Sequence, residues 1–223
     1  MIFLIIDSSS LNTSFCISRN TEILYSSERK HPNGASKLAA GLDKAFRKLS
    51  IGFDDFDAFI LGKGPGSFTG LRISFSVVKA LVLAKKIPVI LLNSFFSCAY
   101  PFRKKYDKIK VVADARRGKI YMSSFVSKNG ILREKQKPGI FSLEEILSCR
   151  DHDLYVSYDG GLRKNILNTC KKINFYHRDV YPKAKYLLEA AGDYYRRAKF
   201  SSLSTMEPMY LHPRTCQVRG SKK

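Results

Sequence analysis

Along the first hundred residues, apolar positions occur either in short runs or at helical spacings of 3 and 4. These patterns predict a series of strands and helices. Residues 2–7 form an apolar run that ends in Asp7, which is typical of a buried strand with a carboxylate at its tip. Helical spacings of 3 and 4 recur over residues 35–49 and again over residues 70–86, and Pro88 ends the second pattern. The remaining segments read as strands, at residues 14–19, 22–27, 59–61 and 89–92.

The second half of the chain repeats this order. An apolar strand over residues 110–114 again ends in an acid, Asp114, and a short turn over residues 115–118 follows it. Further strands are expected near 119–126, 131–137 and 154–158, with a helix near 142–149. A glycine turn at 159–161 then opens another helix, as the glycine-rich loop 62–70 does in the first half.

This repetition predicts an α/β fold of two duplicated lobes, residues 1–103 and 104–223. The alternative is a chance alternation of strands and helices, because the two halves share little sequence identity. Duplicated lobes would point their strand tips toward a common cleft, where ligands of α/β proteins usually bind.

The composition is that of a globular protein, but the charge is unusual. Hydrophobic residues make up 44% and charged residues 26% of the 223 positions. Lys and Arg total 39 against 19 acids, and 26 of these 39 basic residues follow residue 103. The excess fits either a solvated basic surface or a polyanionic partner, and no RNA-binding motif decides between them. The end of the chain is expected to be a basic tail, with Arg214, Arg219, Lys222 and Lys223.

Several classes of protein are disfavoured by what the sequence lacks. No apolar run approaches the roughly 20 residues needed to cross a bilayer, and no basic residues precede the apolar Met1–Ile6 as they would in a signal peptide. The five cysteines are widely spaced and include no C-x-x-C, which favours neither a disulfide framework nor a zinc ribbon. The expectation is therefore a cytoplasmic protein without membrane contact.

The most informative segment is Gly64-Pro-Gly-Ser-Phe-Thr-Gly70. Its glycines permit close backbone approach, and it leads into a helix N-terminus, where free N–H groups can meet an anion. It is not a Walker A loop, because no Lys-Ser/Thr pair follows Gly70, and it does not fit G-x-G-x-x-G. Spacing alone therefore favours a structural turn over a phosphate site. The candidates for a nucleotide site, intact or degenerate, are Asp7, Gly64, Gly66, Ser67, Gly70, Asp114, Gly160 and Gly161.

Five segments, in order along the chain, are similar to those of one protein family. They are Gly64–Arg72 (GPGSFTGLR), Asp114–Tyr121 (DARRGKIY), Tyr158–Gly161 (YDGG), Pro182–Leu188 (PKAKYLL) and Glu207–Leu211 (EPMYL). Together they resemble the TsaB (YeaZ) family. The resemblance implies an actin-like (ASKHA, ribonuclease H-like) fold with duplicated mixed sheets flanked by helices, shared with the catalytic paralogue TsaD. It also implies a part in transferring threonylcarbamoyl to the adenosine next to the anticodon of tRNA.

The same resemblance indicates that this chain is not the catalytic subunit. TsaD follows its glycine loop with N-H-x-x-x-H, whose histidines bind the metal of the active site, whereas Ser94 and Cys98 stand at those places after Asn93 here. A hydroxyl and one thiol do not replace two imidazoles, and the H-E-x-x-H of metal-dependent peptidases is absent. We therefore expect a pseudo-enzyme scaffold with no metal and no cofactor of its own, and ATP or ADP only at the level of the complex.

Two alternatives from other classes stay open at this stage. One is an independent actin-fold enzyme that uses ATP, as kinases do, and the other is a basic RNA-binding module. The residues after the two acidic strand tips disfavour an ATP site, because Ser8–Ser10 follow Asp7, and Arg116 and Arg117 follow Asp114, where a phosphate would need room. Turn capping is the favoured role of both acids.

The helix at 70–86 is too apolar to need only one neighbour. Two stripes lie on its opposite sides, one with Leu71, Phe75, Val78 and Val82 and the other with Ile73, Val77, Ala80 and Ala84. One stripe is expected to pack on the sheet of its own lobe. The other needs a cover, which is either the helix at 35–49 or a second protein.

The family resemblance favours the second protein, since TsaB relatives use this pair of helices to dimerise and to meet TsaD. The implied partners are a TsaD-like catalytic subunit, a TsaE-like ATPase in the same complex, a second copy when the chain is alone, and tRNA through the complex. The candidate interface residues are Leu38, Leu42, Phe46, Leu71, Ile73, Phe75, Val77 and Val78.

Overall fold

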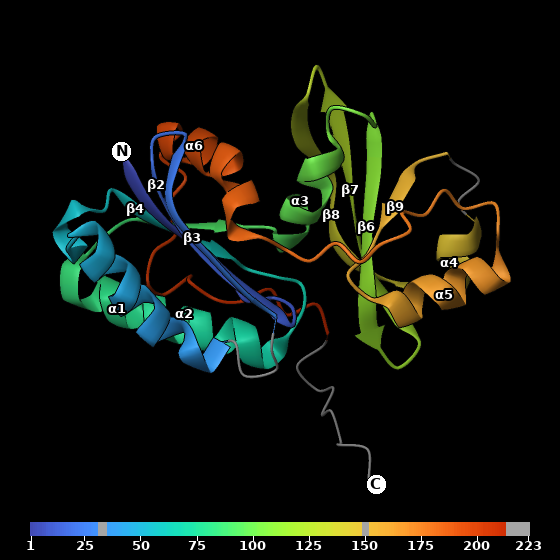
Figure 1. The fold of residues 1–223 in the computed structure, drawn as a ribbon. Helices are drawn as coiled ribbons and strands as arrows, with labels where there is room; N and C mark the ends of the chain where they lie inside the picture. Colours follow the sequence, from blue (N-terminus) through green and yellow to red (C-terminus); the bar gives the residue numbers. More distant parts are fainter. Residues whose placement is uncertain (31–34, 149–151, 213–223) are drawn as a thin grey trace, which may run out of the picture.

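Two mixed sheets lie side by side in the computed structural model, which describes residues 1–30, 35–148 and 152–212 (Figure 1). The first sheet has the order β3-β2-β1-β4-β5. Its first three strands are antiparallel neighbours. β4 pairs with β1 in parallel, and β5 pairs with β4 in parallel. The strands are β1 (Ile2–Asp7), β2 (Asn12–Arg19), β3 (Glu22–Lys30), β4 (Ala58–Gly62) and β5 (Val89–Leu92).

The second sheet repeats this arrangement with the order β8-β7-β6-β9. The strands β6, β7 and β8 form an antiparallel meander, and β9 runs parallel to β6. They span β6 (Lys108–Arg116), β7 (Lys119–Lys128), β8 (Ile131–Ser142) and β9 (Leu154–Val156). Strand β6 is thus the counterpart of β1. The predicted α/β fold with duplicated mixed sheets is confirmed.

The hydrophobic core has three layers, which the two sheets separate. α1 (Leu38–Leu49) and α2 (Phe68–Lys85) cover the outer face of the first sheet, and α4 (Leu143–Ser148) and α5 (Gly160–Thr169) cover the outer face of the second. α3 (Ser94–Ala99) and α6 (Leu188–Arg196) contribute to the middle layer, which contains side chains from both sheets. Short 3-10 helices lie at Ala35–Lys37, Phe53–Asp55, Tyr100–Phe102 and Ala184–Leu187.

The apolar run of β1 follows from this layering. Phe3 and Ile5 belong to the middle layer, whereas Leu4 and Ile6 belong to the layer beneath α1 and α2. Both faces of the strand are therefore buried, and no polar residue interrupts the run before Asp7.

The boundaries of several predicted elements shift for identifiable reasons. α2 starts before the expected residue 70, because the Ser67 hydroxyl caps it by accepting a hydrogen bond from Gly70 N. β6 continues past Asp114 to Arg116 through a bulge, so the expected turn over residues 115–118 is shorter. β9 ends at Val156 rather than at residue 158.

Helix α3 was not predicted from the sequence. All six of its residues, from Ser94 to Ala99, are buried, so no polar face marks a helical period. A short helix surrounded by protein on all sides carries no amphipathic pattern.

The last described segment returns to the first lobe. The 3-10 helix at Ala184–Leu187 contacts β1 and β2, and α6 contacts β5. Ser201 forms an isolated bridge with Val89, and Met206 is fully buried in the layer beneath α1 and α2. Residues beyond 183, which the sequence-based division assigns to the second lobe, therefore also contact the first sheet.

The basic tail expected at Arg214, Arg219, Lys222 and Lys223 lies outside the described residues. Within the described part of the chain, no helix combines the length and apolar character needed to cross a membrane.

Candidate functional site

The glycine-rich loop packs directly on the turn that follows β1. A Cβ on Gly66 would collide with the carbonyl of Ser9, and a Cβ on Gly70 would collide with the carbonyl of Ser8. The Ser67 N–H donates a hydrogen bond to the Ser9 carbonyl at 2.6 Å, and the Ser8 hydroxyl donates to the Gly70 carbonyl at 2.8 Å. These two glycines therefore serve the contact between loop and turn, which supports the structural interpretation of the loop.

The carboxyl group of Asp7 is enclosed by this contact. Its Oδ1 accepts hydrogen bonds from the Ser9 N–H at 2.9 Å and the Ser9 hydroxyl at 2.6 Å. Its Oδ2 is buried without a hydrogen-bond partner, beside the Cα of Gly62 and the hydroxyl of Ser94. Burial raises the pKa of Asp7, against the lowering effect of the Ser9 hydrogen bonds. The side chain caps the turn and does not face solvent.

The segment after β5 fixes the other side of the loop. The Ser94 hydroxyl accepts a hydrogen bond from Gly64 N at 3.0 Å, and the Ser94 N–H donates to the Gly64 carbonyl at the same distance. Cys98 is fully buried, and burial raises the pKa of its thiol well above the ordinary value. A protonated, enclosed thiol is a poor metal ligand. Ser94 and Cys98, which stand where the resemblance to TsaD would place the two histidines, are therefore both held inside the fold.

Asn93 connects the two lobes at this point. Its side-chain oxygen accepts from Phe95 N at 2.9 Å and so caps α3. Its amide nitrogen donates to the Glu134 carboxylate at 2.5 Å and to the Ser123 hydroxyl at 3.2 Å, on β8 and β7 of the second sheet. One side chain thus fixes the start of α3 and the position of the second lobe.

The second strand tip is open where the first is closed. Asp114 accepts a hydrogen bond from Arg116 N at 2.7 Å, and its other oxygen lies 3.5 Å from the Arg116 guanidinium. Arg116, Arg117 and Gly118 follow with φ values of 67°, 54° and 70°, so three successive residues are left-handed. Asp114 thus also acts as a turn cap, here in an exposed, arginine-rich turn.

The glycine turn of the second lobe is a helix cap. The Asp159 carboxylate accepts a hydrogen bond from Leu162 N at 3.0 Å, which caps α5 as Ser67 caps α2. Gly160 lies beside Asp179, whose carboxylate is 2.6 Å from the Arg163 guanidinium. Gly161 is exposed, and the side chain nearest to it is that of Asp159. The nearest neighbours of these two glycines therefore belong to the second lobe and not to the glycine-rich loop of the first.

Sequence reasoning missed Tyr158 as a contact between the two lobes. Its ring lies 6.3 Å from the Phe95 ring of α3. Burial, with smaller contributions from Cys98 and Asp7, raises the pKa of Tyr158 well above its usual range. The motif Tyr158–Gly161 was noted only for its glycines, although its tyrosine is what fills the space between the lobes.

Sequence reasoning also missed a strap, defined here as residues 206–212, that touches both lobes. Met209 N donates a hydrogen bond to the Lys63 carbonyl at 2.8 Å, and the Tyr210 ring lies 5.3 Å from that of Phe68. At its end, the His212 Nε2 is 2.7 Å from the Ala115 carbonyl of the second lobe. The strap therefore runs from the glycine-rich loop to the turn after Asp114.

The eight candidate interface residues divide into two groups. Five are buried in the chain's own core, at 3% exposure or less, namely Leu38, Leu42, Leu71, Phe75 and Val78. The other three, Phe46, Ile73 and Val77, are half-buried. Since α1 and α2 cover the same face of the sheet (Figure 1), the first stripe of α2 is satisfied within the chain. The second, outward stripe is the less covered one, with Ala80 and Ala84 exposed and Ile73 and Val77 half-buried, although Val77 also packs against the core.

Solved structures with the same fold support this description of the architecture. The structure of YeaZ from Pseudomonas aeruginosa superposes with a TM-score of 0.80, covers 94% of this chain and 99% of its own, and shares 20% sequence identity. Together with the two sheets of similar topology, this match shows that the chain has the two-lobed actin-like fold.

Comparison of the sequence narrows this class to a family. A family model described as the tRNA N6-adenosine threonylcarbamoyltransferase TsaD matches residues 27–189. The tRNA threonylcarbamoyladenosine biosynthesis protein TsaB of Haemophilus influenzae is 26% identical over 210 residues, covering 85% of this chain and 86% of the relative. TsaB of Escherichia coli is 28% identical over 166 residues, covering 70% and 71%. The chain belongs to the family that this model describes, and within that family to the TsaB (YeaZ) proteins.

Proposed function

We propose that this chain is a non-catalytic subunit of the machinery that makes threonylcarbamoyladenosine in tRNA, and that it acts by binding a TsaD-like catalytic subunit. The pathway comes from the relatives, which are named for tRNA threonylcarbamoyladenosine biosynthesis. The observation that carries the non-catalytic role is the buried segment after β5. Ser94 is hydrogen-bonded to the glycine-rich loop and Cys98 is enclosed in the core, so neither side chain is free to hold a metal.

The strand tips support the same role. Asp7 is buried and bonded to its own turn, and Asp114 is bonded to Arg116. Among the described residues, no group of three or more His, Cys, Asp or Glu side chains is placed to hold a metal ion. A chain with these sites supports a complex through its surfaces rather than through chemistry at its cleft.

The docking surface that we propose is the outward stripe of α2 with its neighbours. Ile73 and Val77 are half-buried and Leu83 is 69% exposed on the same helix. Phe46 of α1 lies edge-on to Phe53, which is itself 38% exposed, at a ring distance of 5.3 Å. An apolar stripe that the described residues cover only in part is typical of a protein–protein interface. The same stripe would let two copies pair when the catalytic subunit is absent.

Other parts of the complex follow from this proposal. A TsaE-like ATPase would join the assembly, and nucleotide would bind at the level of the complex. The tRNA would be reached through the complex, where the positive charge of this chain favours contact with phosphates.

Two substitutions on α2 test the docking surface. Val77→Asp places a carboxylate on the outward stripe and is expected to leave a folded chain whose affinity for a purified TsaD-like subunit falls by about tenfold or more, as at interface hot spots. Phe75→Asp buries a carboxylate at a position with 3% exposure and is expected to unfold the chain. Circular dichroism and sedimentation would separate the two outcomes.

Lys128→Asp, at an exposed position on β7 of the second lobe, is the matched control for adding a carboxylate. It should preserve both folding and binding. Unchanged binding by a folded Val77→Asp variant would show that the docking surface lies elsewhere. ATP hydrolysis or a stoichiometric transition metal in the purified chain alone would contradict the non-catalytic role and favour the kinase-like alternative.

A further inference from the structure

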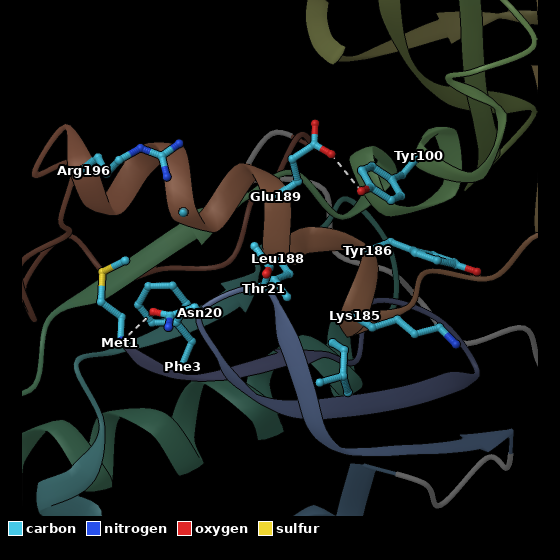
Figure 2. Close-up of a pocket in the computed structure, with 12 residues that line it drawn as sticks. Met1, Phe3, Asn20, Thr21, Tyr100, Lys185, Tyr186, Leu188, Glu189 and Arg196 are labelled. Carbon is cyan, nitrogen blue, oxygen red and sulfur yellow. Dashed lines mark hydrogen bonds between the residues drawn. The ribbon is translucent and has the colours of Figure 1, made fainter. Parts of the chain in front are cut away.

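A groove opens on the first lobe, on the side of the sheet away from α1 and α2 (Figure 2). Its volume is about 600 Å³, within the range of sites that bind small molecules or peptide side chains. The chain start, the β2–β3 turn, Tyr100, and the continuous stretch of the 3-10 helix at Ala184–Leu187 and α6 form its walls. The groove shares no residue with the outward stripe of α2.

The interior of this groove is apolar and open. Phe3 and Leu188 line it, and Met1 and Ile23 expose 43% and 37% of their surface beside it. Tyr186 adds an aromatic wall. Large apolar side chains exposed around a concave surface are what a binding site provides and what a purely structural surface avoids.

Gly192 gives a second, independent indication. It lies inside α6, where glycine costs about 1 kcal/mol relative to alanine. Its backbone has no left-handed φ that would demand glycine, and an added Cβ would meet only the Arg196 guanidinium, at an ordinary contact distance of 3.5 Å. The fold therefore tolerates a side chain at this position. The effect of the glycine is to keep the groove open.

The charges around the groove are positive. Its one lining acid, Glu189, accepts a hydrogen bond from the Tyr100 hydroxyl at 2.8 Å and lies 3.7 Å from the Arg103 guanidinium. Burial and this hydrogen bond raise the pKa of Tyr100 to about 12, so the hydroxyl keeps its proton and continues to donate to Glu189. The acid is thus already engaged within the chain.

The lining cations are less fully engaged. Lys185 shares the single carboxylate of Glu28 with Lys183, at 3.6 Å and 2.8 Å respectively. No carboxylate of the described residues forms an ion pair with Arg196 at the other end of the groove. A ligand with an apolar centre and negative ends would complement this distribution.

We propose that the groove binds a short acidic linear segment of a partner protein. An aromatic or branched side chain of the segment fills the space over Gly192, and its carboxylates pair with Lys185 and Arg196. An open groove with walls from the chain start, the β2–β3 turn, Tyr100 and residues 185–196 fits an extended peptide better than an enclosed small molecule. Because α1 and α2 lie on the opposite side of the sheet, this site and the proposed docking stripe can be occupied together, and neither depends on the other.

The test uses three blocked hexapeptides and the full-length chain labelled for NMR. EEFLEE has the proposed chemistry, KKFLKK reverses its charge, and EESGEE removes its apolar side chains. We expect EEFLEE to shift the amide resonances of the β2–β3 turn and α6, and both control peptides to bind about tenfold more weakly or less, which corresponds to about 1.4 kcal/mol. Equal binding of all three peptides, or shifts confined to another surface, would overturn the proposal.

Gly192→Met tests the role of the open helix position. It fills the groove and should abolish EEFLEE binding, whereas Gly192→Ala adds only one methyl group and should retain most of it. Ile23→Ser, on the exposed strand β3, is an independent variant that removes apolar wall without burying a polar group. Retained peptide binding by both Gly192→Met and Ile23→Ser would contradict the site.

Two further measurements test whether the groove instead binds a small molecule or a second copy of the chain. N-acetylphenylalanine binding as tightly as EEFLEE would assign the groove to a small molecule instead of a peptide. A change of oligomeric state in Gly192→Met, measured by sedimentation, would assign it to a second copy of the chain. Either result would overturn the peptide proposal.

Discussion

Asp7 and Asp114 lie at or near the ends of the corresponding strands β1 and β6, yet their surroundings are opposite. The side chain of Asp7 is fully buried, whereas that of Asp114 is 36% exposed. The glycine-rich loop covers the turn after Asp7 and allows backbone carbonyls to approach Gly66 and Gly70. After Asp114, the strap contacts only the Ala115 carbonyl among the described hydrogen bonds, and Arg116, Arg117 and Gly118 follow in left-handed conformations.

The two lobes therefore share their strand topology without sharing the chemistry of the site at the strand end. Both acids cap a turn, so their common role is structural. What differs is which chain segment lies on top of the turn, and that depends on contacts distant in the sequence. The first tip has become part of the core, while the second remains a basic surface.

The largest effect is expected when the covered turn of the first lobe is forced apart. Gly70→Ala places a Cβ against the Ser8 carbonyl, which is backbone and cannot rotate away, so it should destabilise the chain by about 3 kcal/mol, near the upper end for overpacking. The matching change at the start of α5, Gly161→Ala, is at an exposed position and should stay within about 0.5 kcal/mol of the parent chain. Denaturant unfolding measures both values. Equal effects would show that the close backbone approach at Gly70 does not stabilise the first lobe.

The second-largest effect is expected in the pH dependence of stability, which differs between Asp7 and Asp114. Because burial raises the pKa of Asp7 above its ordinary value of 3.8, the folded chain holds this proton more tightly than the unfolded chain does. The stability that this provides is present below the ordinary pKa and is lost as pH rises through the folded value. Asp7→Asn should therefore gain stability relative to the parent chain as the pH rises above the ordinary pKa of 3.8.

Asp114→Asn controls for the removal of one carboxylate at the exposed tip. The Asp7→Asn result is informative only as a difference between the two variants measured in the same buffers. A stability difference that stays flat over this pH range, or that falls with rising pH, would contradict the buried, proton-retaining description of Asp7.

A smaller effect is expected from loosening the strap at its end on the second lobe. His212→Ala removes the hydrogen bond with the Ala115 carbonyl and the packing on the Tyr121 ring, at a centroid distance of 5.8 Å. The loss should be about 1 kcal/mol, the net contribution of one hydrogen bond. His177→Ala, at an exposed position of the same lobe, is the control and should cost less. Equal costs in urea unfolding would show that the strap does not fix the second lobe.

The smallest effect is expected in the salt dependence of tRNA binding by the complex. Neutralising Arg133 and Lys135, both exposed on the edge strand β8, should flatten the slope of log K against log salt by about 0.9 for each duplex phosphate that the variant no longer neutralises. Neutralising Arg47 and Lys48 on α1 of the first lobe is the control. An affinity that does not change with salt would mean that the charge of this chain is only a solvated surface.

Much of the architecture could be predicted from the sequence, because local patterns determined it. The apolar runs of β1 and β6 and the spacings of α1 and α2 are direct consequences of which faces become buried. Helix α3 could not be predicted, because a helix buried on all sides has no period. The exact course of β6 beyond Asp114 also escaped prediction, since a bulge depends on the partner strand.

The candidate site was less predictable for a related reason. The residues of the glycine-rich loop were identified, but their role depends on the Ser8 and Ser9 carbonyls, which lie about sixty positions earlier in the chain. The strap depends on pairings such as that between His212 and Ala115, which are 97 positions apart. Such pairings leave no trace in local spacing. They also explain why five of the candidate interface residues turned out to be core residues.

The position of Met206 has a consequence for how the chain is made. This residue is fully buried beneath α1 and α2, although it is synthesised long after the strands that it covers. Synthesis on the ribosome proceeds from the N-terminus, and domains generally fold as they emerge. We expect the core of the first lobe to stay incomplete until Met206 in the strap has left the exit tunnel. A nascent chain that stalls within the second lobe therefore exposes unfinished apolar surface, and it is this intermediate that chaperones would have to hold.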